Sequence, residues 1–268
     1  MGDDLNHPSH WWGKYSLAQH ELWQWQIGSL LLNIRCLPNE WQVAYKQSDE
    51  SADDENFWRI QQLEEEAQWF ENSSRYVFRE ITGMLSVSPL LADRPVISRP
   101  RSPFNIVAGE EVTLYVSTPL WMELGVGKQQ KKLTELVIQR PSDTWFGPST
   151  LEGELCYATT THCRLYLDEI PQRAHRAITP VVIRNQADST LSVERLNVPA
   201  PLLPLYATTS GQLWTPKVTL TRLEHGEMAA LKIDKQAPIE AKGAKAIRAP
   251  RKVTSSGMLI RAFNAVFS

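Results

Sequence analysis

Two cysteines and two histidines lie close enough along the chain to suggest a metal site. Cys156, His162 and Cys163 form a tight group, and His175 follows soon after. Thiolates and imidazoles are common zinc ligands, but structural zinc sites pair their ligands at closer spacing than this set does. We therefore expect no metal here. The two cysteines are interpreted as buried thiols on the two arms of a hairpin around 159–161. A redox-dependent bridge would form only if their sulfurs face each other.

A pair of glycines next to a lysine suggests phosphate chemistry. The segment from Gly125 to Lys128 resembles a fragment of a phosphate-binding loop. The complete pattern needs a glycine five residues before the second Gly and a Ser or Thr after the Lys, and Met122 and Gln129 occupy those places. Glycines separated by one residue are common in loops, so the segment is predicted to be a turn.

Two groups of acidic residues, 53–55 and 64–66, could supply the acid and base of a sugar hydrolase. The paired carboxylates of glycosidases lie about 5–9.5 Å apart on facing elements, and neighbours on one helix cannot flank a bond in that way. We interpret both groups as a solvated helix face. The sequence also lacks a Gly-x-Ser-x-Gly elbow and any recognisable Ser-His-acid spacing. We expect no catalytic residues and no cofactor, and a hydrolase whose acids are not paired by sequence stays a third alternative.

Aromatic side chains offer a different chemistry. The chain has ten tryptophans, which is many for 268 residues. An indole has a large apolar face and one N–H donor, so it suits both half-buried sheet faces and recognition surfaces. Four tryptophans could form a stacking platform for a carbohydrate or another small ligand, namely Trp11, Trp12, Trp121 and Trp145. A ligand-binding β-sandwich is therefore the main alternative function.

The elements that position these residues are predicted to be strands. Short runs alternate apolar and polar residues, most clearly Leu22–Ile27 and 112–116. A period of two puts successive side chains on opposite faces of a sheet. The runs Leu22–Ile27, 30–35 and 40–46 look like a meander. We predict a mainly β protein with antiparallel β-sandwich architecture in two halves. One amphipathic helix is expected at about 53–71, where apolar residues recur every three or four positions.

The proline-rich segment 89–103 is expected to be an extended crossover and the main domain boundary. We predict a β-rich domain at 1–98, a β-sandwich domain at 99–235, and a basic linker with an apolar end at 236–268. Within the second domain, the alternation changes phase at Glu194 and Arg195, between Leu191 and Val198. A β-bulge would absorb that change.

The last part of the chain is basic and then apolar. Between 232 and 252 the chain carries seven Lys and Arg residues against two acidic ones, and an apolar run follows at 258–267. This tail could pack back on the domain, dock a partner protein, or lie on anionic lipid. Nucleic acid is not expected, because the net charge is −2 and the tail lacks interleaved aromatic residues. Docking would use Arg261, Phe263 and Phe267.

Compartment and function follow from composition. The three cysteines form an odd set, which fits reduced thiols in a cytoplasm, and the N-terminus has no secretory pattern. No apolar run approaches the roughly 20 residues of a membrane-spanning helix. We predict a non-catalytic cytoplasmic interaction module that docks a protein partner through its C-terminal segment.

Two stretches carry a family resemblance. One is Pro89–Val96 followed by Val112–Trp121, and the other runs from Trp145–Ser149 through Gly153–Tyr157 to Val181–Asn185. Together they resemble the uncharacterised prokaryotic family called domain of unknown function 432. The resemblance extends to about Ile233 and leaves the basic tail outside. It implies no activity and no catalytic residues. Members encoded beside small-conductance mechanosensitive channels imply a membrane-associated partner.

Overall fold

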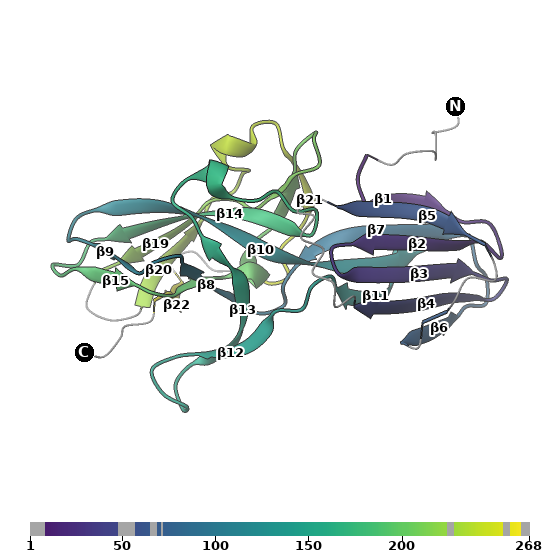
Figure 1. Ribbon diagram of the computed structural model, residues 1–268, viewed down its shortest axis with the longest axis horizontal. Coiled ribbons are helices and arrows are strands. Elements are labelled where there is room, and N and C mark those ends of the chain that lie inside the picture. Colours follow the sequence, from purple (N-terminus) through teal and green to yellow (C-terminus); the bar gives the residue numbers. More distant parts are fainter. Residues whose placement is uncertain are drawn as a thin grey trace. The chain divides into compact units, whose positions relative to one another are not determined.

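The computed structural model describes residues 9–47, 57–64, 69–70, 72–223, 228–253 and 258–263. These residues form a mainly β protein with several sheets, as predicted (Figure 1). The described ranges contain no α-helix, and their helical turns are the short 3₁₀ segments η1 (Leu167–Glu169), η2 (Ala200–Leu202) and η3 (Ile239–Ala241). No helix among the described residues has the length and apolar character to cross a membrane.

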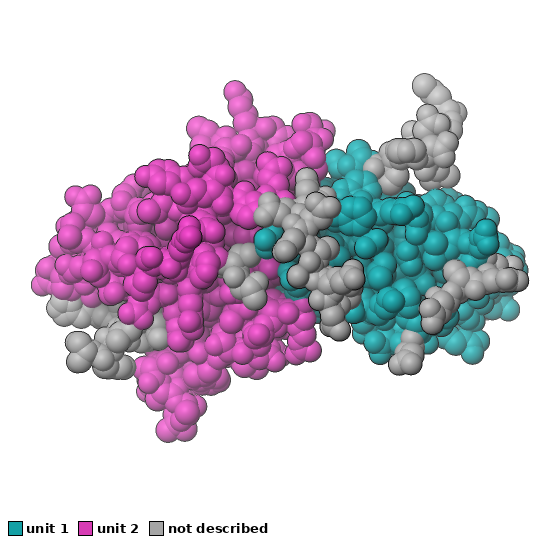
Figure 2. Space-filling view, in the orientation of Figure 1, with its two compact units in different colours: residues 1–90, 120–139, 173–175 teal, residues 91–119, 140–172, 176–268 magenta. Residues whose placement is uncertain are grey.

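The chain divides into two compact units (Figure 2). Unit 1 comprises Met1–Leu90, Leu120–Gln139 and Arg173–His175, and unit 2 comprises Leu91–Pro119, Arg140–Gln172 and Arg176–Ser268. The prediction placed one boundary near residue 98. In the structure the chain leaves unit 1 at Leu90 and returns to it twice. The long strand β10 (Glu111–Val126) contributes its first part to unit 2 and its second part to unit 1.

A five-stranded antiparallel sheet forms one layer of unit 1. It contains the predicted meander, and the turn that joins Leu22–Ile27 to Leu30–Cys36 uses Gly28 with a positive φ of 52°. Glycine adopts this left-handed conformation without steric cost. In spatial order the strands are β5 (Trp58–Leu63), β2 (Leu22–Ile27), β3 (Leu30–Cys36), β4 (Glu40–Gln47) and β6 (Ser73–Val77).

A second layer of unit 1 packs its apolar face on this sheet. The Tyr15 ring of β1 meets the Trp25 ring of β2 edge-to-face, with centroids 5.2 Å apart. Trp25, Leu32 and Ile34 are fully buried between the layers. Besides the second part of β10, the strands of this layer are β1 (Gly13–Ser16), β7 (Met84–Leu91) and β11 (Lys131–Val137).

The predicted helix at 53–71 is wrong for the described part of that range. Trp58–Leu63 is strand β5, which pairs antiparallel with β2 in the register Leu22↔Leu63 to Ile27↔Trp58. Residues 51–56, 65–68 and 71 lie outside the described residues. The apolar spacing of this segment is compatible with either element over so short a run. Long-range pairing with the open edge of β2 decides the outcome, because propensity is a weak prior.

Unit 2 is built around β14 (Arg176–Asn185). This strand pairs antiparallel with β10 but parallel with β18 (Leu213–Trp214) and β19 (Val218–Arg222). Antiparallel pairs extend the sheet through β17 (Leu205–Ala207) and β21 (Lys245–Arg248) and, from β19, through β20 (Met228–Ile233) and β22 (Leu259–Arg261). The parallel pairs correct the prediction of an antiparallel architecture. They arise because these strands are not joined by hairpins.

Two smaller sheets complete unit 2. The four-stranded sheet has the order β12 (Ser142–Phe146), β13 (Glu154–Cys163), β8 (Val96–Pro100) and β16 (Leu196–Val198), and β13 and β8 are parallel. β15 (Leu191–Val193) pairs with β9 (Phe104–Ile106). The proline-rich segment therefore contains a sheet strand, β8, in addition to extended crossover. The change of phase at Glu194 and Arg195 is a switch between two sheets and is not a bulge within one strand.

Candidate functional site

The cysteines and histidines that were weighed as metal ligands, and for which no metal was expected, do not come together. Cys156 and Cys163 both lie on strand β13, where they pair with Thr144 of β12 and Pro100 of β8. The hairpin interpretation is therefore wrong, and a separation on the order of 20 Å along one strand excludes a bridge between them. His175 belongs to unit 1. Within the described ranges, no three His, Cys, Asp or Glu side chains cluster as a metal ion requires.

The three thiols are buried and free. Burial raises the pKa of Cys156 to about 12 and that of Cys36 and Cys163 to about 11. The thiolate is the nucleophile, so we expect the native thiols to react with a disulfide reagent at pH 8 at least about 100-fold more slowly than free cysteine. The measurement is the rate of thiol modification, with the urea-unfolded chain as control. One fast thiol in the native protein would contradict this expectation.

The predicted turn is present but shifted, because Gly125 and Val126 are the last residues of β10 and the turn comprises 127–130. It joins β10 to β11, Gly127 has a positive φ of 75°, and its N–H donates to the carbonyl of Met84. The N–H of Gln130 then donates to the carbonyl of Gly127 and closes the turn. These backbone groups are therefore engaged within the protein.

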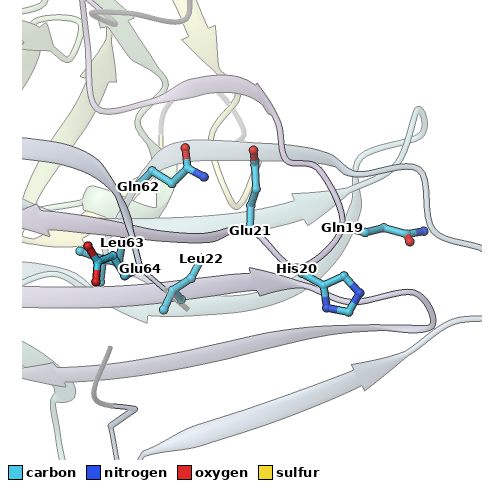
Figure 3. A pocket seen from close by; sticks show the side chains of 7 residues that line it. All are labelled: Gln19, His20, Glu21, Leu22, Gln62, Leu63 and Glu64. Atoms are coloured by element: carbon cyan, nitrogen blue, oxygen red, sulfur yellow. The ribbon is translucent and has the colours of Figure 1, made fainter. Parts of the chain in front are cut away.

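A polar hollow of about 540 Å³ lies in unit 1 and was not identified from the sequence (Figure 3). The carboxylate of Glu21 accepts hydrogen bonds from the Ala18 N–H at 2.9 Å and from Trp23 Nε1 at 3.1 Å. In Figure 3, Glu21 and Gln62 point to the same side, whereas His20 and Glu64 point elsewhere. Glu21 and Glu64 thus do not face each other as a glycosidase pair would. The other acidic residues that were interpreted as a solvated helix face, 53–55 and 65–66, lie outside the described residues.

The four candidate tryptophans do not form one platform. Trp11 is fully buried and its Nε1 donates to the carbonyl of Ala174, and Trp121 is also buried. Trp12 is half-buried and stacks on the His10 ring. Trp145 is 44% exposed and lies in unit 2. Trp145 is therefore the candidate with the most accessible indole.

Trp145 belongs to an apolar face on the β12–β13 hairpin. Its register partner on β13 is Leu155, so the two side chains lie next to each other on one face, and Leu155 is 45% exposed. Leu151, in the connection between the strands, is 93% exposed. We call Trp145, Leu151 and Leu155 the hairpin face. β12 is the edge strand of the four-stranded sheet, and the connection from β12 to β13 projects beyond the rest of unit 2 in Figure 1 and is the lowest magenta projection in Figure 2.

The hairpin is held in place from inside. Trp145 Nε1 donates to the carbonyl of Ser149 at 2.7 Å, and Ser149 Oγ accepts from the N–H groups of Leu151 and Glu152. On the opposite side of the strands, Phe146 and Cys156 are buried in a small cluster with Ile97. The exposed side chains are therefore presented by an ordered element, which lowers the entropy cost of binding.

Polar groups border the hairpin face. Asp143 and Tyr157 form the next cross-strand pair, and Tyr157 Oη donates to Asp93 Oδ1 at 3.0 Å. The Arg94 guanidinium lies over the Tyr157 ring at 5.2 Å and contacts Asp143 Oδ1 at 3.2 Å. Trp, Tyr and Arg are enriched at protein interfaces, and an apolar centre with a polar border is the usual arrangement of such an interface. Trp145 was named as a candidate from the sequence, but its pairing with Leu155 could not be predicted, because that pairing depends on strand register.

The predicted docking residues of the tail lie in and around β22. The Arg261 carbonyl accepts a hydrogen bond from Asn197 Nδ2 at 2.8 Å. Phe263 is 1% exposed and forms an isolated bridge with Leu196. Phe267 lies outside the described residues. For residues 258–263, the structure thus shows the first of the three predicted arrangements, in which the tail packs back on the domain.

Comparison with known families gives one match over nearly the whole chain. Residues 11–268 match the family described as Protein of unknown function (DUF432). The chain belongs to this family. The match confirms the resemblance and includes the basic tail, which had been expected to lie outside it. Comparisons with curated proteins and with solved structures gave no match.

Proposed function

We propose that this member of the family is a non-catalytic interaction module that binds a protein partner through the hairpin face. The observation that carries the proposal is the directly paired, half-exposed Trp145 and Leu155 on a projecting hairpin, with the more exposed Leu151 in its connection. Large apolar side chains grouped on an ordered element commonly mark protein contacts. This proposal moves the docking site from Arg261, Phe263 and Phe267 to the hairpin, since Phe263 is occupied in the core.

The module is proposed to act in the cytoplasm. Its three buried cysteines are free, and none of them has a bridge partner within the described strands. Free thiols of this kind fit a reducing compartment.

Substitution of the two exposed leucines tests the proposal. In the double variant Leu151→Ser, Leu155→Ser, we expect the affinity for the partner to fall at least about tenfold, because burial of each leucine is worth about 1.5–3 kcal/mol. The measurement is quantitative capture of partner proteins on the immobilised full chain, followed by titration of each captured protein.

The matched control is Val107→Ser, Leu223→Ser, which alters two exposed aliphatic side chains of unit 2 away from the hairpin. Thermal unfolding of all variants should coincide with that of the wild type. Equal binding of every captured protein by the hairpin and control variants would refute the proposal.

A further inference from the structure

The loop between β20 and β21 has an exposed aliphatic side chain in a basic setting. We call residues 235–245 the basic loop. Figure 1 shows it as the short yellow-green helical turn of unit 2 and the chain on either side. At its centre, η3 presents Ile239 with 87% of its surface exposed. An aliphatic side chain that is so exposed contributes little hydrophobic stabilisation to the fold, so its apolar surface is available for contact with a lipid or another molecule.

The basic loop is firmly anchored beneath Ile239. Ala241 is buried in a cluster with Ile178, Tyr206 and Trp214. Tyr206 Oη donates to the carbonyl of Lys235 at 2.9 Å. Backbone hydrogen bonds from Ala241 to Pro238 and from Ala244 to Ala241 close the turn. The outward direction of Ile239 is therefore set by the fold.

The basic loop carries three lysines, which lie on either side of Ile239 in the sequence. Lys235, Lys242 and Lys245 are exposed, and no salt bridge joins them to an acidic group among the residues that the structure describes. The one acidic residue of the loop, Glu240, accepts a hydrogen bond from Tyr115 Oη at 2.8 Å. Three lysines and one glutamate leave the loop a formal charge of +2. The neighbouring Asp234 is paired with Lys217 at 3.5 Å.

We propose that the basic loop docks on an anionic phospholipid surface, with Ile239 inserted at the headgroup boundary and the three lysines over the lipid phosphates. Charge complementarity selects this occupant, because several lysines attract anionic headgroups and one apolar side chain adds burial. A hollow of about 500 Å³, lined by Tyr206, Lys235, Ile239 and Lys242 among others, gives a headgroup room beside the loop. The basic loop shares no residue with the hairpin face.

Vesicle co-sedimentation of the full chain tests the proposal. The probes are vesicles of phosphatidylcholine alone and of phosphatidylcholine with phosphatidylglycerol. We expect binding to the anionic vesicles only. Replacement of Lys235, Lys242 and Lys245 by Gln should weaken it about 100-fold, since each basic residue contributes about fivefold at such a surface. Ile239→Ser should weaken it about tenfold through lost apolar burial.

The matched charge control replaces Lys14, Arg101 and Lys128 by Gln, three exposed basic residues outside the basic loop, and the matched apolar control is Val107→Ser at a side chain that is 55% exposed. Both controls should bind anionic vesicles like the wild type. Equal binding to the two kinds of vesicle, or no binding to either, would overturn the proposal, and so would equal losses in the control and loop variants. An Ile239→Ser variant that binds the anionic vesicles like the wild type would also overturn it, because the lysines alone would then account for binding without any insertion of Ile239.

Discussion

Replacing Phe263 by alanine is expected to destabilise unit 2 by about 3–5 kcal/mol, the range for removal of a buried phenylalanine. Phe263 is 1% exposed, and it bridges Leu196 of the four-stranded sheet. The neighbouring Ala262 is fully buried, and its carbonyl accepts a hydrogen bond from the Asn197 N–H at 3.0 Å. A cavity left here would therefore lie where the C-terminal strand is joined to the rest of unit 2.

Urea unfolding of the Phe263→Ala variant, combined with hydrogen exchange of the β20 and β16 peptides, measures this effect. The control is Leu259→Ala on β22, where the side chain is 57% exposed. An exposed substitution of this kind should change stability by no more than about 0.5 kcal/mol. If Phe263→Ala kept full stability and lost only partner binding, Phe263 would be a docking residue, and our assignment of it to the core would fail.

Replacing Asn185 by alanine should cost about 3–5 kcal/mol, since it removes buried hydrogen bonds that the Asn185 amide donates to two carbonyls and one that it accepts from a buried cation. Asn185 is fully buried at the end of β14. Its Nδ2 donates to the carbonyls of Ile106 at 2.9 Å and Ser189 at 2.8 Å. Its Oδ1 accepts from Nη1 of Arg222, which is only 6% exposed.

The side chain of Asn185 thus connects three separate segments, and water cannot easily replace it at a buried position. The matched control is Gln186→Ala, because Gln186 is the adjacent residue and is exposed. Hydrogen exchange of β14 and β19 should rise strongly in Asn185→Ala and stay unchanged in the control. Equal protection in both variants would show that the network around Arg222 contributes little.

These two substitutions alter buried residues that hold the segments of unit 2 together, and they do not alter the proposed binding surfaces. The hairpin face and the basic loop consist of side chains that unit 2 exposes, while Phe263 and Asn185 are ones that it buries. Loss of binding without loss of stability is therefore expected only for the exposed set. Stability measurements on every variant separate the two classes.

Local pattern in the sequence was sufficient for the meander of unit 1 and for the presence of a turn near Gly127, although the turn is at 127–130 and Gly125 is still in β10. Both depend on neighbouring residues alone, since alternation assigns side chains to two faces and glycine permits the turn. Long-range pairing decided that Trp58–Leu63 is a strand at the edge of β2, that Cys156 and Cys163 share one strand, and that the segment from Leu191 to Val198 joins two sheets.

The same distinction holds for the candidate surfaces. The sequence identified Trp145 and the basic tail as features of interest, and composition is enough for that. It could not tell that Trp11 and Trp121 are buried while Trp145 lies open beside Leu155, or that Phe263 is covered while Ile239 is exposed. Exposure depends on which distant segments cover a side chain, and that is settled only when the sheets have formed and packed.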